Sequence, residues 1–177
     1  MKEKHTLIVV LVLLGLVIYY SFFENYASLK ERERRPGPLI FELSPMEIKR
    51  IEIKRLDGGE LIGERNQMRR WVLVKGNRAE QWESKVDDFI FNLLMLVEID
   101  KFRVENSQLK NFGLENPGLR ITLTDITDKT YQILIGNSNP VRTSLYVKFV
   151  ESPNVIITGA ILNYELQKLN SLFTPEH

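Results

Sequence analysis

The sequence predicts an α+β protein in which an apolar N-terminal helix precedes antiparallel strands packed against a long helix and a C-terminal helix. Three observations support this class. An uncharged run extends from Thr6 to Phe23, apolar and polar residues alternate with tight turns after it, and two later segments have helical apolar spacing. We divide the chain into residues 1–23 (cytoplasmic tail and transmembrane anchor), residues 24–38 (charged stalk) and residues 39–177 (extracytoplasmic α+β domain).

The N-terminal run has the length and composition of a membrane anchor. At about 1.5 Å per residue, a helix over Thr6 to Phe23 just crosses a hydrocarbon core of roughly 30 Å. Lys2 and Lys4 also suit a cleaved signal peptide, but the residues near a cut after Ala27 are mostly too large for a signal peptidase. The sequence therefore predicts an uncleaved, single-pass membrane anchor.

The orientation of the anchor depends on the basic residues that flank it. Lys2 and Lys4 lie closest to the membrane, whereas the basic residues of the stretch LKERERR lie farther away and alternate with glutamates. A simple count over the usual window slightly favours a cytoplasmic C-terminal side. We give the nearer charges more weight and expect the N-terminus in the cytoplasm.

Gly15 is the residue that we single out as a binding candidate. It lies within a bulky apolar run, where a missing side chain lets another membrane helix approach closely. Leu11 and Tyr19 stand four positions away on either side, so the second small residue of a helix-dimer motif is missing. The expected contact is with a helix of a different membrane protein.

Composition excludes several classes of function. A formal net charge of +1, with basic residues scattered among acidic ones, gives no broad field for nucleic acid. The chain has no cysteine, which removes disulfides, thiolate metal ligands and cysteine nucleophiles together. The roughly 140 residues after the stalk suffice for one domain with its own core.

The stalk precedes the domain as a short charged segment. Lys, Arg and Glu are good helix formers and could continue the membrane helix, and a solvated stalk is favoured over contact with lipid headgroups. Pro36-Gly37-Pro38 then ends any helix and sets the domain off.

The first half of the domain is predicted to form three strands followed by a long helix. The strands cover 49–56, 60–65 and 70–75, and turns at 57–59 and 66–69 join them into a meander.

The long helix is predicted over 78–97, with Asn77 and Glu80 at the spacing of a capping box. Its apolar face, which the sheet must cover, comprises Trp82, Val86, Phe89, Ile90, Leu93, Leu94 and Val97. Its solvent face comprises Glu83, Lys85, Asp88 and Asn92. Asp87 and Asp88 point in different directions on a helix, so we interpret them as solvated charges and not as metal ligands.

The second half repeats the order of strands followed by a helix. Its strands are predicted over 99–104, 119–124, 130–135, 145–150 and 155–158. A short helix near 107–112 ends at Gly113, which can adopt a left-handed conformation. A terminal helix over 160–173 has an apolar stripe of Leu162, Leu166, Leu169 and Phe173. The repeated order allows two meander-and-helix halves, although no sequence identity links them.

The sequence contains no grouping of catalytic residues. His5 borders the membrane and His177 is the last residue. Four hydroxyl residues lack both a histidine partner and a nucleophile elbow: Ser44, Ser138, Thr143 and Ser144. The glycine pair 58–59 lacks the lysine and helix of a phosphate loop. We therefore expect no enzymatic activity, no cofactor and no metal site.

Several turn and strand motifs resemble those of a bacterial family, domain of unknown function 4340. They are Phe112-Gly113-Leu114-Glu115-Asn116-Pro117, Ile135-Gly136-Asn137, Leu145-Tyr146-Val147, Val155-Ile156-Ile157 and the upstream Trp71-Val72-Leu73. The likeness covers most of Ile48 to Phe173 and includes the single N-terminal membrane helix. Gly76-Asn77-Arg78-Ala79 departs from the family pattern, which usually enters its long helix through a proline- or alanine-rich segment.

The resemblance implies a non-enzymatic accessory role. Members of this family are often encoded near ABC-type permeases and the auxiliary subunit of gliding-motility transport systems. The expected partners are therefore the membrane, a multi-pass permease and that auxiliary subunit. One alternative is an envelope assembly or scaffold protein. Another is a glycan- or lipid-binding module using Trp71, Trp82, Tyr131 and Tyr146, although their positions favour core packing.

Overall fold

The computed structural model describes Leu13, Gly15, Leu16, Tyr19 and residues 37–173. The chain divides into two compact units, Met1–Pro36 and Gly37–His177. Within the described residues, no helix is both long and apolar enough to cross a membrane. The predicted anchor and stalk fall mostly outside that part of the chain, and their structure stays a prediction.

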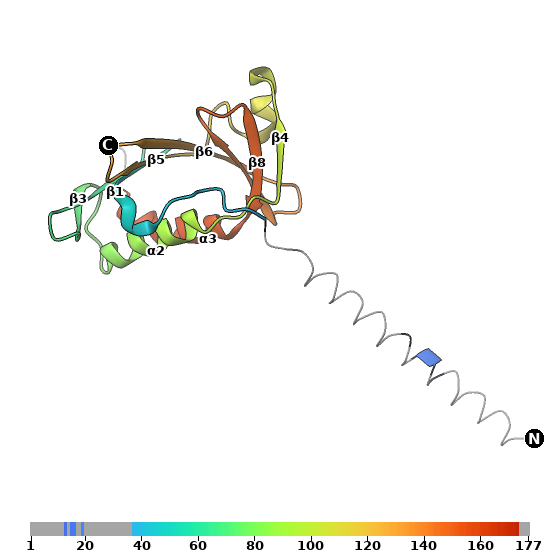
Figure 1. Cartoon of the computed structure of the whole chain (residues 1–177), viewed down its shortest axis with the longest axis horizontal. Helices are drawn as coiled ribbons and strands as arrows, with labels where there is room; N and C mark the ends of the chain where they lie inside the picture. Colours follow the sequence, from blue (N-terminus) through green and yellow to red (C-terminus); the bar gives the residue numbers. More distant parts are fainter. Residues whose placement is uncertain (1–12, 14, 17–18, 20–36, 174–177) are drawn as a thin grey trace, which may run out of the picture. The chain divides into compact units, whose positions relative to one another are not determined.

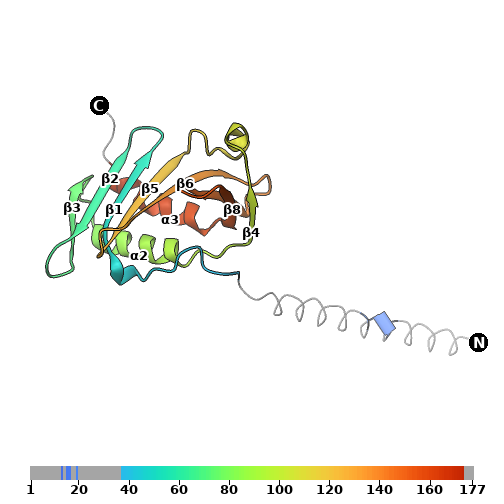
Figure 2. The same ribbon diagram turned by 45° about the horizontal axis from the view of Figure 1, so that its top comes forward.

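The second unit is built on one antiparallel sheet (Figures 1 and 2). Its eight strands lie in the order β3-β2-β1-β5-β6-β7-β8-β4. The strands are β1 (Ile48–Arg55), β2 (Glu60–Arg65), β3 (Trp71–Lys75), β4 (Asp100–Arg103), β5 (Leu119–Asp125), β6 (Thr130–Ser138), β7 (Ser144–Phe149) and β8 (Asn154–Gly159). All eight occur where the alternating pattern predicts a strand, so the α+β class and the antiparallel sheet are confirmed.

The two meanders are not separate halves. β1 pairs with β5 in antiparallel register, with Ile51 opposite Leu123 and Ile53 opposite Ile121, and this pairing joins β1–β3 to β5–β8. β4 follows the first helix in the chain but pairs with β8 at the far edge. The two predicted meander-and-helix halves therefore share one continuous sheet, because the non-local β1–β5 pairing joins them.

Two helices, α2 (Trp82–Leu94) and α3 (Ile161–Leu169), lie beneath one face of the curved sheet (Figure 1). They also pack against each other. Phe89, Ile90 and Leu93 on α2 are fully buried together with inward side chains of β1, β5 and β6. Each such side chain contributes roughly 1.5–3 kcal/mol of hydrophobic stabilisation. The predicted apolar faces of both helices are thus the ones that the sheet covers, apart from Val97.

The opposite face of the sheet carries a smaller apolar cluster over its C-terminal strands. Its buried members are Val104, Leu114, Leu134 and Val155. A 3₁₀ segment, η2 (Asn106–Phe112), covers this cluster, and Phe112 packs edge-to-face on Tyr146 with ring centroids 5.0 Å apart. β6 is consequently buried on both faces at residues 133–135.

Two helix ends differ from the prediction. α2 begins at Trp82 and not at Arg78, and its N-cap is Gln81 with φ of 56° and no side-chain cap. The predicted capping box is wrong, because the Asn77 side chain instead donates a hydrogen bond to the Phe173 carbonyl at 2.8 Å. α2 ends at Leu94, so that Val97 lies beyond the helix.

Short 3₁₀ turns replace some of the predicted helix. The predicted helix near 107–112 is the 3₁₀ segment η2, and it ends at Gly113 with φ of 69°, as expected. The terminal helix closes with a further 3₁₀ turn, η3 (Asn170–Leu172). A capping box that the sequence analysis missed joins Ser44 and Glu47 at η1 (Pro45–Glu47).

Candidate interaction surface and pocket

The chain enters the second unit along the segment that connects α2 to β4. Leu39 forms an antiparallel bridge with Val97. Ile40 N–H donates to the Leu96 carbonyl at 2.9 Å, and Glu98 N–H donates to the Pro38 carbonyl at 2.8 Å. We call this paired region, residues 37–40 with 96–98, the junction.

Gly37 is required at the junction for steric reasons. A Cβ built on Gly37 would lie 1.8 Å from the Glu98 carbonyl oxygen and 3.0 Å from its carbonyl carbon. Both atoms belong to the backbone, so they cannot move aside as a flexible side chain would. Gly37 therefore permits a close backbone approach, beyond the helix-ending role that the sequence analysis assigned to it.

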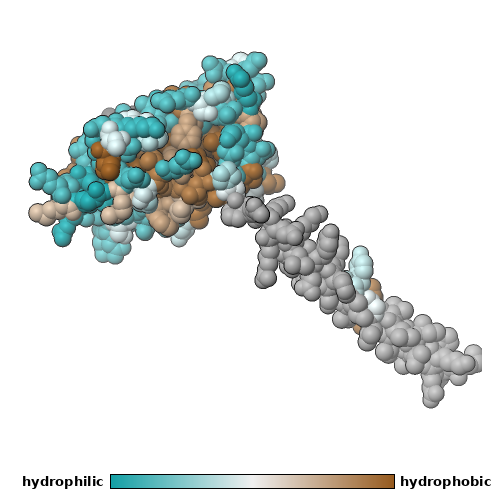
Figure 3. Space-filling view, in the orientation of Figure 1, coloured by the Kyte–Doolittle hydropathy of each residue, from teal (hydrophilic) through white to brown (hydrophobic). Residues whose placement is uncertain are grey.

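Large apolar side chains are exposed around the junction. The exposed fractions are 46% for Leu39, 53% for Phe91, 46% for Met95 and 59% for Ile99. Phe91 and Met95 stand one helical turn apart, and Leu39 is bridged to the segment that follows them. Figure 3 shows exposed apolar atoms near the segment after residue 37, bordered by hydrophilic ones. Clustered exposed apolar residues are typical of a surface that binds another macromolecule.

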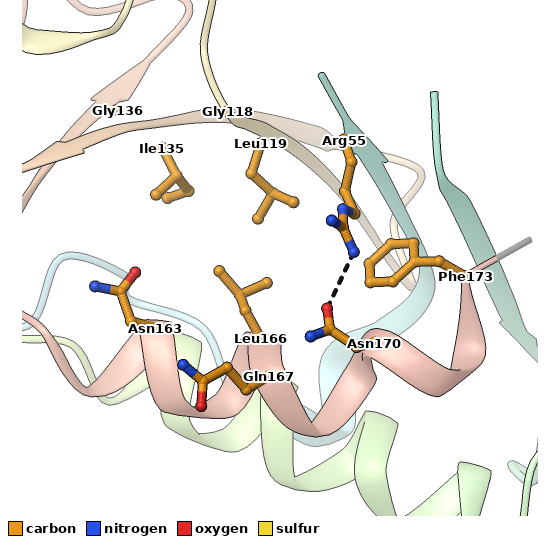
Figure 4. Close-up of a pocket in the computed structure, with 10 residues that line it drawn as sticks. All are labelled: Arg55, Gly118, Leu119, Ile135, Gly136, Asn163, Leu166, Gln167, Asn170 and Phe173. Carbon is orange, nitrogen blue, oxygen red and sulfur yellow. Dashed lines mark hydrogen bonds between the residues drawn. The ribbon is translucent and has the colours of Figure 1, made fainter. Parts of the chain in front are cut away.

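A pocket of about 240 Å³ lies between α3 and the adjoining ends of β5 and β6 (Figure 4). Its sheet side consists of Gly118, Leu119, Ile135 and Gly136, and its helix side consists of Asn163, Leu166, Gln167 and Asn170. Arg55, from the end of β1, and Phe173 complete the lining. Apolar and polar groups thus face one small space.

Arg55 is held in place at the pocket by three contacts. Its Nη1 donates to Asn170 Oδ1 at 3.0 Å, and its Nη2 lies 2.6 Å from Asp57 Oδ2. The guanidinium carbon lies 5.1 Å from the centroid of the Phe173 ring, which is a favourable cation–π distance. The side chain of Arg55 remains 33% exposed.

The helix side of the pocket carries carboxamides at helical spacing. Asn163, Gln167 and Asn170 stand at i, i+4 and i+7, so they share one face of α3 and the turn that follows it. Asn163 Nδ2 donates to Ser138 Oγ at 3.2 Å, which fixes its orientation. This pocket was not predicted from the sequence. The sequence signal for it was the spacing of these three carboxamides, four and then three residues apart, next to the apolar face that includes Leu162 and Leu169.

The titratable groups with shifted pKa values form hydrogen bonds within turns or belong to ion pairs. A hydrogen bond from the Thr127 hydroxyl, together with backbone N–H donors, holds the pKa of Asp125 below its usual range despite burial. Burial lowers the pKa of Lys148, whose Nζ donates to the Phe149 carbonyl at 3.1 Å. A hydrogen bond to Glu165 raises the pKa of Lys168.

An ion-pair network crosses the sheet at β1, β2 and β3. Lys54 lies 2.6 Å from Glu52 and 3.3 Å from Glu60, and its pKa is raised chiefly by the hydrogen bond to Glu52. A hydrogen bond from Lys75 lowers the pKa of Glu60. The lysines of these pairs are about half exposed whereas Glu52 and Glu60 are half-buried, so solvent still screens each pair and its contribution to stability is small.

The hydroxyl residues considered for catalysis have structural hydrogen bonds. Ser44 caps η1, and Ser138 accepts from Asn163. Thr143 N–H and Ser144 N–H both donate to Asn139 Oδ1, at 2.9 and 3.1 Å. His5 and His177 lie outside the described residues. Within the described part of the chain, no group of three or more His, Cys, Asp or Glu residues is placed to hold a metal ion.

The four aromatic residues considered for glycan or lipid binding belong to the interior. Trp71 and Trp82 are buried, and Tyr131 and Tyr146 are half-buried against the two apolar clusters. Their predicted core packing is therefore confirmed.

Asp87 is an exposed charge, as the sequence predicts, and its carboxylate also makes two defined contacts. Its Oδ1 accepts from Trp71 Nε1 at 2.6 Å and pairs with Arg65 Nη2 at 2.7 Å. The predicted solvent face of α2 holds for Glu83 and Asp88, which are exposed, whereas Lys85 and Asn92 are half-buried.

Gly15, the predicted membrane-helix contact, belongs to the first unit. It is helical and exposed, and a Cβ built there meets no atom within 4 Å. Leu13, Leu16 and Tyr19 are likewise exposed. These facts leave the predicted contact with another helix a prediction.

The fold and surfaces define a compact α+β module with an apolar junction surface at its N-terminal entry and a small mixed pocket under its sheet. Residues 71–175 match the family described as Domain of unknown function (DUF4340), and the chain belongs to that family. The family resemblance drawn from the turn motifs is thereby confirmed. Comparisons with curated proteins and with solved structures gave no match.

Proposed function

We propose that this protein is a non-enzymatic, single-pass membrane-anchored accessory subunit of an ABC-type transport system. Its N-terminal helix lies in the bacterial inner membrane, and its α+β unit lies outside the cytoplasm. It binds a multi-pass permease and the auxiliary subunit of the same transport complex. The uncharged run from Thr6 to Phe23 supports the anchor, and the family's frequent genomic context motivates the transport role.

The observation that carries the proposal is the exposed apolar surface at the junction. Leu39, Phe91, Met95 and Ile99 surround the point where the chain arrives from its membrane-anchored part. Chain connectivity keeps this surface within reach of a membrane-embedded partner. The close approach of Gly37 to Glu98 holds residues 37–40 against residues 96–98 within the second unit.

An envelope assembly or scaffold protein is the second candidate. The same junction surface supports it, because a scaffold also needs a protein-binding face beside its anchor. The two functions differ in the identity of the partner, which purification from membranes reveals directly. The third candidate, a glycan- or lipid-binding module, has weaker support because its four aromatic residues pack in the interior.

The test is affinity purification of the full-length chain from detergent-solubilised membranes, with retained proteins identified by mass spectrometry. The double variant Phe91→Ser with Met95→Ser should reduce recovery of the permease at least fivefold. The matched control, Ile126→Ser with Val141→Ser, changes two residues that are 53% and 73% exposed elsewhere on the unit and should leave recovery unchanged.

Exchange of the anchor tests the membrane part separately. Replacing Thr6 to Phe23 by an unrelated apolar helix of equal length should reduce permease recovery without changing membrane retention, if Gly15 takes part in recognition. Undiminished recovery would place recognition wholly outside the anchor. Recovery of envelope assembly proteins with no transporter component would overturn the transport proposal in favour of the scaffold.

A further inference from the structure

We propose that the pocket between α3 and the ends of β5 and β6 binds a small ligand that combines a carboxylate with a compact apolar body. The proposal concerns a different surface from the junction and stands independently of the proposed transport role. It rests on the placement of Arg55, on the neutral carboxamides of α3 and on the apolar side chains that line the same space.

Arg55 is arranged as an anion receptor. A guanidinium has five N–H donors in a fixed planar fork, and this fork matches the two oxygens of a carboxylate. The hydrogen bond to Asn170 uses one N–H of Nη1, and the ion pair with Asp57 involves Nη2, so further N–H donors of the guanidinium remain for a ligand. Those contacts and the Phe173 ring hold the side chain in one place, which lowers the entropy lost on binding.

The other polar lining groups are neutral. Asn163, Gln167 and Asn170 each offer both a donor and an acceptor. Arg55 is the charged residue of the lining, and Asp57 lines the adjoining opening on the other side of Arg55. Because Asp57 offsets part of the guanidinium charge, selection depends on directed hydrogen bonds as well as on charge. Both oxygens of a carboxylate can accept from the free N–H groups of Arg55. The NH₂ group of a neutral amide is itself a donor and cannot accept from them.

The remaining lining sets the size and character of the ligand body. Leu119, Ile135 and Leu166 face the space as apolar side chains (Figure 4). At about 240 Å³, the pocket is somewhat smaller than the roughly 300–1,000 Å³ of sites for drug-sized ligands. An acid the size of a single amino acid therefore fits better than a nucleotide or a long lipid.

The test uses the full-length chain in detergent micelles, with N-acetyl-L-leucine as the probe and N-acetyl-L-leucinamide as its uncharged twin. Binding is followed by NMR through the methyl groups of Leu119, Ile135 and Leu166. The acid should give saturable shifts at these methyls, and the amide should bind at least tenfold more weakly. Equal binding of acid and amide, or shifts centred elsewhere, would overturn the proposal.

Two variants test the pocket independently. Arg55→Gln should weaken binding of the acid at least tenfold and bring it to the level of the amide. Gly118→Leu adds a bulky side chain at a lining residue whose Cβ position has no atom within 4 Å, so it should weaken binding of both probes. Arg120→Gln, an exposed basic residue on β5 outside the lining, is the matched control and should bind normally.

Unfolding of a variant is detected in the same spectra by the methyl signals of Leu93 and Leu123 in the core. If Arg55→Gln remains folded and binds the acid as well as the unmodified chain, the proposal is wrong. A tripeptide, N-acetyl-Gly-Gly-Leu, separates the two sources of a carboxylate. If the tripeptide binds as tightly as N-acetyl-L-leucine, the natural ligand is a peptide C-terminus. If the tripeptide binds much more weakly, the ligand is a free small acid. Either result supports a carboxylate site.

Discussion

Gly37→Ala is predicted to open the junction without unfolding the rest of the unit. The added Cβ would lie 1.8 Å from the Glu98 carbonyl oxygen, whereas ordinary contacts begin near 3.4 Å. Closing that gap requires the backbone at residue 37 to withdraw from residue 98. The Leu39–Val97 bridge and its two flanking hydrogen bonds, Ile40 N–H to Leu96 and Glu98 N–H to Pro38, are then lost.

The expected magnitude follows from those two hydrogen bonds. Each contributes about 1 kcal/mol net, so the local opening free energy should fall by about 2 kcal/mol. Since 1.4 kcal/mol corresponds to tenfold in an equilibrium, the exchange protection of the Ile40 and Glu98 amides should fall roughly thirtyfold. The core amides of β1 and β5 should keep their protection, because the junction lies outside the sheet.

Hydrogen–deuterium exchange followed by NMR measures both effects in one sample. Gly118→Ala is the matched control, because its new Cβ meets nothing within 4 Å, and it should leave every protected amide unchanged. Unchanged protection of Ile40 and Glu98 in Gly37→Ala would refute the argument that the close backbone approach requires glycine. A uniform loss across the sheet would refute the claim that the effect is local.

Three further predictions follow from burial, from the apolar run and from charge. Trp82→Asp should destabilise the protein by about 4 kcal/mol or more in urea denaturation, because it leaves a cavity and buries a charge at a side chain that is 7% exposed. Glu83→Ala, at the exposed neighbouring residue, should change stability by less than about 0.5 kcal/mol. Equal small effects of the two substitutions would show that the buried face of the helix is wrongly assigned. The full-length chain should stay with membranes after high-salt and carbonate washing, since burial of residues 7–23 outweighs screened charge contacts, and a shortened soluble protein starting near Ala27 would instead establish cleavage. Because the pKa of Asp125 is lower in the folded than in the unfolded protein, its stabilising effect is complete above the unfolded pKa near 3.8 and is lost as pH falls through the folded pKa. Asp125→Asn should therefore reduce the loss of unfolding free energy at acid pH. An unchanged loss at acid pH would contradict the stabilising role of the Asp125 carboxylate.

Local sequence signals determine most of the strands and one face of each helix. The alternation in β1 and β5 reflects one buried face, and the hairpin turns join neighbours in the chain. The β1–β5 pairing and the position of β4 next to β8 join segments that are distant in the sequence. No turn residue encodes such non-local pairing, and this is why the sequence left open whether the strands form one sheet or more.

The start of α2 shows a local signal overridden by tertiary contacts. Asn77 and Glu80 have capping-box spacing, yet the Asn77 side chain donates a hydrogen bond to the Phe173 carbonyl. The backbone N–H of Asn77 donates to the Leu172 carbonyl at 2.7 Å. These partners lie almost a hundred residues away in the chain. The same C-terminal turn completes the pocket lining at Phe173. The pocket therefore could not be assembled from the sequence alone, although the amide spacing on α3 was visible.

One structural element ties the junction to the pocket. Thr158, fully buried at the end of β8, donates its hydroxyl to the Val97 carbonyl at 2.9 Å and so holds the junction. α3 begins three residues later, and Asn170 at its far end holds Arg55 in the pocket. At 1.5 Å per residue, the nine residues of α3 separate these ends by about 13 Å. Because Leu162 and Leu169 anchor the helix in the core, α3 acts as a rigid spacer. The chain thus runs from a residue that contacts the junction directly into the helix whose far end contacts Arg55.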